Sequence, residues 1–150
     1  MEIYSMLIKI RYVLGFSLLE LMLAISIVAI LSSIAYPSYR EHVARARRTE
    51  AQSAVMAIAQ FMEKNYTATG SYILSTSGGV TTLPFYSIPK DSSNPYYIIS
   101  LSDVTSSAFT VVATRAGSMN GDYCGDFALD YTGVKSIKNA GSGVLISQCW

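Results

Sequence analysis

The sequence has 150 residues, which is enough for one domain of ordinary size but too few for two. Apolar residues make up 51% of it, charged residues make up 14%, and the mean hydropathy is +0.33. These values exclude a disordered chain and are too apolar for a typical soluble protein, and the formal net charge of +1 is not the basic excess common in nucleic-acid-binding proteins.

The apolar excess is concentrated near the N-terminus. Residues 16–39 carry a single charge, Glu20, and the 19 residues from Leu21 to Tyr39 are all uncharged. At about 1.5 Å of rise per residue, a helix of this length just crosses a hydrocarbon core of about 30 Å. We therefore expect a transmembrane and assembly helix over residues 16–39, followed by a head domain over residues 40–150.

The charge on Glu20 is energetically costly in this apolar segment unless it has a partner. A charge inside a membrane costs about 2.5 to 3.5 kcal/mol on insertion scales. Cleavage between Gly15 and Phe16 would create an α-amine about one helical turn away, so Glu20 of one subunit can pair with the Phe16 amine of its neighbour. The alternative is that Glu20 interacts only with the positive end of its own helix dipole, which is worth about 0.3 to 1 kcal/mol.

The residues around this bond form a known motif. Gly-Phe-Ser-Leu-Leu-Glu-Leu at residues 15–21 resembles the prepilin peptidase site of type IV pilins, and Pro37 lies where many pilins carry a helix-breaking proline. Later stretches resemble minor pilins of the PilE and ComP kind, namely residues 36–39, 47–52, 61–63 and 149–150.

This resemblance implies a leader over residues 1–15, cleavage after Gly15, N-methylation of Phe16 by the same peptidase, and assembly through Phe16, Glu20 and Pro37. The implied partners are other pilins in a helical filament, the prepilin peptidase and the inner-membrane assembly machinery. The subunit would be held in the inner membrane with a periplasmic head before assembly and would be extracellular in the pilus afterwards. Adhesion, twitching motility and DNA uptake are the implied roles. The leader is longer and more apolar than is usual in the family, and Met6 is an alternative start.

The helical pattern continues beyond the apolar segment. Apolar residues recur at steps of three and four between Ala51 and Tyr66, as in an amphipathic helix packed on a domain. Gly70 is the expected helix stop. Pro37 removes one backbone hydrogen bond and predicts a kink or local melting. The polar residues expected on the other helix faces are Arg45, Arg48, Thr49, Gln52 and Glu63.

The second half of the head has the pattern of a small sheet. Residues 71–95 read as an irregular connection with a short strand over residues 80–83. Four strands are expected after it, over residues 96–101, 108–115, 124–131 and 134–137, with a Thr132-Gly133 hairpin between the last two. Apolar and polar residues alternate in the middle two strands, so one sheet face should pack on the helix. The expected fold is therefore α+β, the type IV pilin fold: a long N-terminal helix on a four-stranded antiparallel sheet (residues 96–137), with a C-terminal disulfide region (residues 124–150).

Cys124 and Cys149 are the only cysteines. In an exported domain we expect them to form a disulfide, which would close a loop of about 25 residues and contribute about 3.5 kcal/mol on the chain-entropy model. Two metal-binding thiols are the alternative, but His42 is the only histidine and other ligands are lacking. A disulfide also places the head outside the cytoplasm, an orientation that basic residues on both flanks of the apolar segment leave open.

The sequence contains no recognisable catalytic constellation. It has no second histidine, no Gly-x-Ser-x-Gly elbow and no phosphate-binding glycine loop. Asp122, Asp126 and Asp130 recur at every fourth residue; calcium binding is one interpretation, but we expect solvated turn acids. We therefore predict a structural subunit that is not an enzyme and uses no metal or cofactor.

DNA binding is the main alternative function, because ComP-like pilins include DNA receptors. The candidate contacts on the head are Lys135, Lys138 and Arg115, with Tyr123 and Trp150 as candidate stacking groups. The mature chain carries nine Lys or Arg and nine Asp or Glu residues, so only a local basic stripe would support this function.

Two further kinds of protein have a similar layout. Type II secretion pseudopilins share the N-terminal motif, but the C-terminal disulfide loop and the PilE-like stretches favour a pilus subunit. An uncleaved periplasmic domain with one membrane span is the other alternative, and a mature chain that begins at methylated Phe16 would exclude it.

Overall fold

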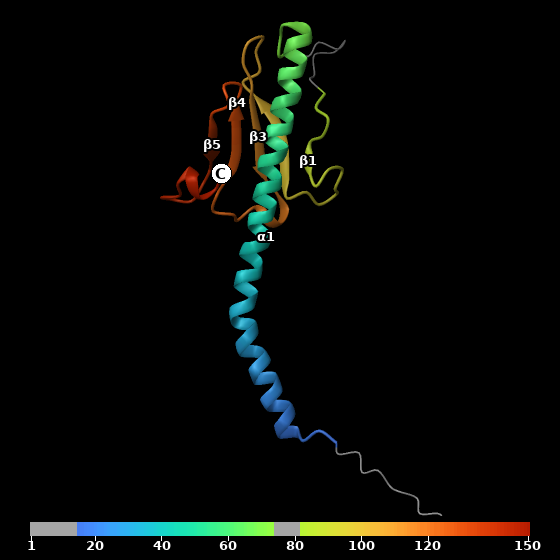
Figure 1. Ribbon diagram of the computed structural model, residues 1–150, viewed down its shortest axis with the longest axis vertical. Helices are drawn as coiled ribbons and strands as arrows, with labels where there is room; N and C mark the ends of the chain where they lie inside the picture. The colour runs from blue at the N-terminus through green and yellow to red at the C-terminus, as the bar shows by residue number, and fades with distance from the viewer. Residues whose placement is uncertain (1–14, 74–81) are drawn as a thin grey trace, which may run out of the picture. The chain divides into compact units, whose positions relative to one another are not determined.

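The computed structural model describes residues 15–73 and 82–150 (Figure 1). The leader before Gly15 and residues 80 and 81 of the strand expected over residues 80–83 lie outside the described residues, and residues 82 and 83 are not in a strand. The chain divides into two compact units, residues 1–39 and residues 40–150. We describe each unit by itself and call the second one the head.

A single helix, α1 (Leu18–Thr69), contributes to both units. It is unbroken at Pro37, so the expected local melting is wrong. A proline inside a helix removes only one backbone hydrogen bond, and the bonds on either side hold the helix together. The helix ends at Gly70, as expected. Gly70 has φ +74°, a conformation that favours glycine, and its N–H donates to the carbonyl of Tyr66 at 2.7 Å.

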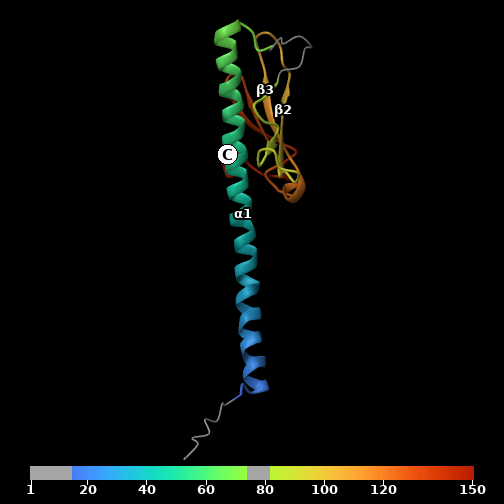
Figure 2. The ribbon, with the colours of Figure 1, turned by 90° about the vertical axis from the view of Figure 1, so that its right-hand side faces the viewer.

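The head contains one antiparallel sheet of five strands in sequential order (Figures 1 and 2). The strands are β1 (Ser87–Ile88), β2 (Tyr97–Ser102), β3 (Thr110–Arg115), β4 (Asp126–Asp130) and β5 (Lys135–Lys138). The sequence predicts a sheet of only four strands, and β1 is the strand of the sheet that it misses. This strand has two residues and precedes Pro89, so it is too short for an alternating pattern to reveal it.

The core of the head lies between α1 and one face of the sheet, and Figure 2 shows the helix running along that face. The expected alternation is confirmed in β3, where Val111 and Ala113 are buried and Thr110 and Val112 are partly exposed. The largest fully buried side chains include Tyr97, Phe109, Phe127, Ile58 and Met62.

Strand β4 does not show the expected alternation, because Asp126 and Ala128 are buried as well as Phe127 and Leu129. Ala128 lies in a cross-strand row between Val112 and Ser136, and its small side chain is covered by these neighbours on both sides. Asp126 is buried for a different reason, which involves an arginine partner described below.

The hairpin between β4 and β5 is built around Asp130. The carboxylate of Asp130 accepts hydrogen bonds from the backbone N–H of Thr132 at 2.9 Å and of Val134 at 3.0 Å, and from the Thr132 hydroxyl at 2.6 Å. These bonds, with that of the Thr132 hydroxyl first, lower the pKa of Asp130. The tight turn is centred on Tyr131-Thr132, one residue earlier than predicted, and Gly133 follows it with φ +83°.

Candidate functional site

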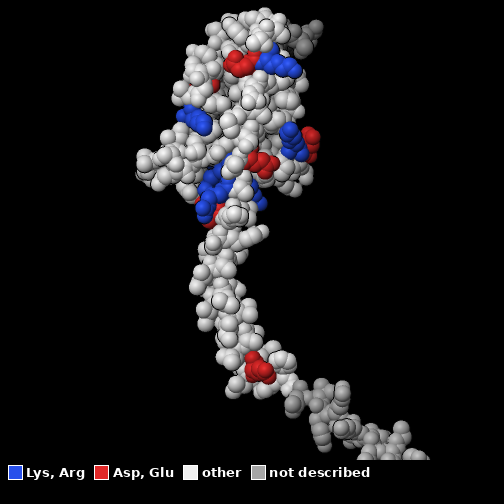
Figure 3. Space-filling model, in the orientation of Figure 1, with Lys and Arg blue, Asp and Glu red and all other residues white. Residues whose placement is uncertain are grey.

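The first unit presents an apolar surface to its surroundings. Every described residue from Gly15 to Tyr39 is exposed, and Figure 3 shows this part of the surface as almost wholly uncharged. By length and composition, α1 can cross a membrane. The exposed large apolar side chains of this unit are Phe16, Leu18, Leu19, Leu21, Met22, Leu23, Ile25, Ile27, Val28, Ile30, Leu31, Ile34, Tyr36 and Tyr39.

Two of the serines within this apolar surface bond inside the helix. The hydroxyl of Ser26 donates to the carbonyl of Leu23 at 2.8 Å, and the hydroxyl of Ser33 donates to the carbonyl of Ile30 at 2.7 Å. These hydroxyl protons therefore need no water, which lowers the cost of placing both serines in an apolar environment.

Glu20 lies in the first turn of α1. The helix begins at Leu18, two residues later than expected, and its first backbone bond runs from the Leu21 N–H to the Ser17 carbonyl at 3.1 Å. Phe16 therefore lies just before the helix. Among residues 15–73 and 82–150, no Lys, Arg or His side chain forms an ion pair with Glu20. The described fold thus offers this carboxylate only the positive end of the helix dipole.

The head contains a buried charge network centred on Arg48. Its side chain is only 4% exposed. Two of its nitrogens donate hydrogen bonds to the Asp122 carboxylate, Nε to Oδ1 at 3.0 Å and Nη2 to Oδ2 at 2.6 Å. A third nitrogen, Nη1, donates to Glu41 at 3.0 Å, and the guanidinium lies 4.4 Å from the ring centroid of Tyr123. Burial opposes the charge on Arg48, but the two carboxylates more than compensate and raise its pKa.

The sequence predicts Arg48 on an outer face of the helix, and this prediction is wrong. The buried residues of α1 are Arg48, Ala51, Val55, Ile58 and Met62. Arg48 therefore extends the buried stripe by one further step of three residues, which is a signal that the sequence does contain. Its main partner, Asp122, is 74 residues away, so the spacing could not identify the ion pair.

A second ion pair joins Arg115 to Asp126. Arg115 Nε donates to Asp126 Oδ1 at 3.1 Å, the backbone N–H of Arg115 donates to the same oxygen at 3.0 Å, and the Asn139 amide donates to Oδ2 at 2.7 Å. Burial alone would raise the pKa of Asp126, but these donors together lower it. The other Arg115 nitrogens donate to the carbonyls of Asp122 and Asn139.

These contacts change two expectations. Asp122 and Asp126 are not solvated turn acids, because their carboxylates are buried against arginines. Asp130 is the last residue of β4, and its carboxylate bonds the hairpin turn that follows. Among the described residues, no cluster of three His, Cys, Asp or Glu side chains could hold a metal ion. The guanidinium of Arg115 is occupied by contacts within the head, which leaves it poorly placed for the DNA contact considered above.

The other two candidate DNA contacts lie on the edge strand β5 and are exposed. Lys135 Nζ is 4.9 Å from the ring centroid of Trp150, and the Trp150 indole N–H donates to the Ser136 carbonyl at 3.2 Å. Lys135 and Lys138 are three residues apart in a strand, so they project from opposite faces of the sheet. They therefore do not form a single-faced stripe.

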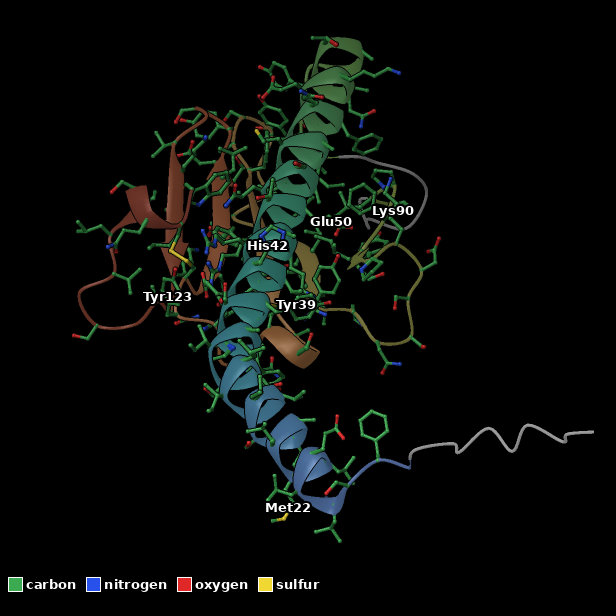
Figure 4. All side chains as sticks on the ribbon, turned by 60° about the horizontal axis from the view of Figure 1, so that its bottom comes forward. Met22, Tyr39, His42, Glu50, Lys90 and Tyr123 are labelled. Atoms are coloured by element: carbon green, nitrogen blue, oxygen red, sulfur yellow. A yellow bond between two sulfur atoms is a disulfide. The ribbon has the colours of Figure 1, made fainter. Side chains whose placement is uncertain are left out.

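Cys124 and Cys149 form a disulfide with a Cα–Cα distance of 5.6 Å (Figure 4, yellow bond). Both cysteines are buried. The Gln52 amide on α1 donates to the Cys149 carbonyl, and the Cys124 N–H donates to Asp122 Oδ1 at 3.0 Å. The disulfide region is thus tied to the helix directly at Cys149 and, at Cys124, through the Arg48–Asp122 pair.

Comparisons with known proteins point to pilins. Residues 10–36 match the prokaryotic N-terminal methylation motif. The fimbrial protein EcpC of Eikenella corrodens and a fimbrial protein of Moraxella nonliquefaciens are each 51% identical to this chain over 37 residues, which is 25% of this chain and 24% of each relative. The chain therefore matches about a quarter of the length of these relatives.

Two solved structures are also similar. A type IV pilin from Shewanella oneidensis is 25% identical, with 71% of this chain and 96% of that chain covered and a TM-score of 0.43. The minor pilin PilV of Neisseria meningitidis is 22% identical, with 67% and 93% covered and a TM-score of 0.47.

A family model covers most of the head. The model described as "Type IV minor pilin ComP, DNA uptake sequence receptor" matches residues 37–128, which is more than half of the chain. The matched range includes Arg48, Asp122, β2 and β3 and ends within β4. The chain therefore belongs to the ComP family of type IV minor pilins.

Proposed function

We propose that this minor pilin is cleaved after Gly15, N-methylated at Phe16, and polymerised into a pilus through residues 16–39. In this proposal, Glu20 of each subunit pairs with the Phe16 amine of a neighbouring pilin. The observation that carries the proposal is a wholly exposed apolar helix segment whose one charge has no ion-pair partner among the described residues.

The energetics favour two successive environments for this segment. Fully burying a side chain such as Leu, Ile, Val or Phe contributes about 1.5 to 3 kcal/mol, so fourteen exposed large apolar side chains make residues 16–39 unstable in water. The segment can be covered by lipid before assembly and by neighbouring pilin helices afterwards. A lone buried carboxylate becomes tolerable when it meets a cation, and the amine at Phe16 supplies one.

Peptidase cleavage, assembly by the inner-membrane machinery and a periplasmic head before extraction also belong to the proposal. Two observations support them: the match to the methylation motif across the Gly15-Phe16 bond, and a disulfide, which is typical of oxidising compartments outside the cytoplasm.

Glu20 variants test the proposal. Glu20→Ala should still be cleaved and methylated, because the scissile bond is intact, but should be at least tenfold depleted from sheared pili. Glu20→Asp keeps the charge and should recover part of the incorporation. Intact mass of the membrane fraction measures processing, and quantitative mass spectrometry of the pili measures incorporation. Normal incorporation of Glu20→Ala would overturn the role of Glu20.

DNA binding by the head is the second candidate function, since the matched family description names a DNA uptake sequence receptor. On this chain the supporting observation is that Lys135 and Lys138 are exposed on β5 and that Lys135 Nζ lies 4.9 Å from the ring centroid of the partly buried Trp150. We leave Arg115 out of this proposal because its guanidinium is bonded within the head.

The salt dependence of DNA affinity tests this second function. If both lysines contact phosphates, the variant Lys135→Gln/Lys138→Gln should bind duplex DNA more weakly and lower the slope of log K against log salt by about 1.8. Lys64→Gln/Lys90→Gln removes the same charge elsewhere and should leave the slope unchanged. Equal slopes for the wild type and the β5 variant would rule out a contact through this strand.

A further inference from the structure

Asn120 and Gly121 form the only Asn-Gly pair in the chain. They lie in a turn that follows the short 3-10 helix η1 (Gly117–Met119) and precedes Tyr123, which Figure 4 labels. The side-chain carbonyl of an asparagine can be attacked by the backbone nitrogen of the next residue. Glycine favours this attack because it has no side chain to shield its nitrogen or to restrict its backbone. The pair therefore has the local sequence most prone to spontaneous loss of a side-chain amide.

Both reacting groups are accessible in the folded head. Asn120 and Gly121 are exposed. Within the part of the chain that the structure describes, the Asn120 amide forms no hydrogen bond and the Gly121 N–H donates to no acceptor. A Cβ built on Gly121 would have no atom within 4 Å, so the turn has open space on this side.

One backbone bond of the turn opposes the reaction. Asn120 has ψ −30°, so its backbone must rotate before its side chain can reach the Gly121 nitrogen. This rotation breaks the bond from the Asp122 N–H to the Met119 carbonyl, which measures 2.9 Å. A single exposed turn of this kind opens by local fluctuation without unfolding of the head.

We propose that Asn120 is a site of spontaneous deamidation. The Gly121 nitrogen loses its proton and bonds to Cγ of Asn120, and the side-chain nitrogen leaves with a proton as ammonia. The product is a cyclic succinimide. Water then opens either C–N bond of the ring and leaves aspartate or isoaspartate at position 120. The net reaction is hydrolysis of the amide, with one water consumed and one ammonia released.

The position of this turn gives the reaction a structural consequence. Arg47 Nη1 donates to the Ser118 hydroxyl at 2.8 Å, and Arg48 Nη2 donates to Asp122 Oδ2 at 2.6 Å. Asn120 lies midway between these two contacts. Isoaspartate carries the main chain through its side chain and adds one backbone carbon there, whereas aspartate leaves the length of the backbone unchanged. Two consecutive arginines on one helix cannot follow the added atom, so the isoaspartyl form should lose the close Arg48–Asp122 geometry.

The modification accumulates with the age of the protein, because each chain reacts independently and hydrolysis is not reversed. It weakens the contact between α1 and the disulfide region, since Asp122 also accepts the Cys124 N–H at 3.0 Å. The proposal is independent of the role of Glu20 and of DNA binding.

Incubation of the full-length protein in detergent at mildly alkaline pH tests the proposal. Peptide mapping by mass spectrometry, with fragmentation that distinguishes aspartate from isoaspartate, measures the modified fraction over time. An unaged sample digested in parallel corrects for amide lost during digestion. Amide loss should be about tenfold or more faster at Asn120 than at Asn139, which precedes alanine and whose amide donates to Asp126 at 2.7 Å. It should rise with pH, because the attacking nitrogen must lose its proton.

Gly121→Ala is the matched control. Gly121 lies outside the left-handed region and has open space around an added Cβ, so this variant should fold like the wild type. Its new methyl group shields the nitrogen and should slow amide loss at Asn120 about tenfold. Equal rates in the wild type and in Gly121→Ala, or a rate at Asn120 no higher than at Asn139, would overturn the proposal.

Hydrogen exchange of the Cys124 N–H tests the structural consequence, because this group is bonded to Asp122. Asn120→Asp reproduces the aspartyl product and should exchange at the wild-type rate. The isoaspartyl fraction of the aged protein, separated by chromatography, should exchange about tenfold faster. Exchange no faster than in Asn120→Asp would show that the added backbone atom leaves the Arg48–Asp122 pair intact, and this part of the proposal would then be wrong.

Discussion

Arg48 carries its charge in a nearly dry part of the head, and this makes it sensitive to the loss of its partner. Asp122, whose side chain is 5% exposed, receives Arg48 on one side and the Cys124 N–H on the other. Burying two charges is costly, and the cost is offset only while both are present and well bonded. The pair therefore fixes how α1 meets the disulfide region more than it adds net stability.

Arg48→Met should lower the free energy of unfolding by about 3 to 5 kcal/mol, because it leaves Asp122 buried without a cation. The double variant Arg48→Met/Asp122→Leu removes both charges and should be more stable than the single variant. Arg45→Met, at an exposed position, should change stability by less than about 1 kcal/mol. Denaturation followed by Trp150 fluorescence in detergent-solubilised protein measures all three; a double variant less stable than the single would contradict this account.

The lowered pKa of the Asp126 carboxylate predicts that the head loses stability in acid. Its pKa is lowered in the folded head by the Arg115 and Asn139 donors, so the unfolded chain binds the proton more tightly. The stabilisation is fully present above the ordinary Asp pKa of about 3.9 and is lost as the pH falls through the lower folded value.

Thermal unfolding between pH 7 and pH 2 checks this prediction. The wild type should lose stability below about pH 4. Asp126→Asn cannot titrate; it should be less stable at neutral pH and should show a smaller change in acid. The Asp130 carboxylate, whose pKa is also lowered, will retain part of the acid dependence in that variant. Identical profiles for both proteins would exclude a role for Asp126.

The elements of the head depend on one glycine where β4 begins. Gly125 has φ +77°, and a Cβ built on it would lie 2.2 Å from the Lys138 carbonyl oxygen and 2.7 Å from the Ala140 nitrogen. Both atoms belong to the backbone at the end of β5, so they can move away only by opening the β4–β5 pairing.

Gly125→Ala should therefore destabilise the head by more than about 3 kcal/mol, which exceeds the cost of the left-handed backbone alone. Gly133→Ala is the matched control, because Gly133 has φ +83° and no atom within 4 Å of the added carbon. The control should lose only about 1 to 2 kcal/mol. Thermal unfolding of the two variants separates the clash from the backbone strain; equal losses would show that the close approach is unimportant.

The elements were largely predictable from local patterns. The stripe of apolar residues along α1, the stop at Gly70 and the alternation in β3 each depend on neighbours within a few residues, and the structure confirms them. Strand β1 is too short to carry a pattern. The burial of Asp126 could not be predicted, because its guanidinium partner lies on another strand and sequence spacing does not encode that contact.

The candidate functional residues also fall into two groups, those that the local sequence identifies and those that depend on contacts between distant residues. The motif around Gly15, Phe16 and Glu20 is contiguous, so the sequence identifies it directly. The burial of Arg48 and the internal bonding of Arg115 depend on contacts between residues far apart along the chain. From the sequence alone, both arginines are interpreted as surface charges, and Arg115 is therefore predicted to be a candidate DNA contact.

At the scale of the whole molecule, the disulfide holds the C-terminal segment against the head. Replacing both cysteines with alanine should lower the free energy of unfolding by about 3.5 kcal/mol on the chain-entropy model. The loss should be coupled to the Arg48–Asp122 pair, because the Cys124 N–H bonds to Asp122. A double-mutant cycle with Asp122→Asn measures this coupling, and strict additivity would show that the disulfide does not position Asp122.

The apolar segment and the head have opposite requirements. The head buries an apolar core between α1 and the sheet, whereas residues 16–39 expose their apolar side chains, which must be covered by lipid or by other pilins. The pairing of Glu20 with a neighbouring amine is the step that would convert a membrane-held subunit into a filament subunit with a defined axial position.

The most direct measurement of that step is zero-length cross-linking inside purified pili with an apolar carbodiimide, which can enter a dry helix bundle. The account predicts an amide bond between Glu20 of this subunit and the N-terminal amine of an adjacent pilin, found by mass spectrometry in a species of two chains. Recovery of this chain with its leader intact, or of intact pili in which Glu20 never links to an adjacent amine, would contradict the account.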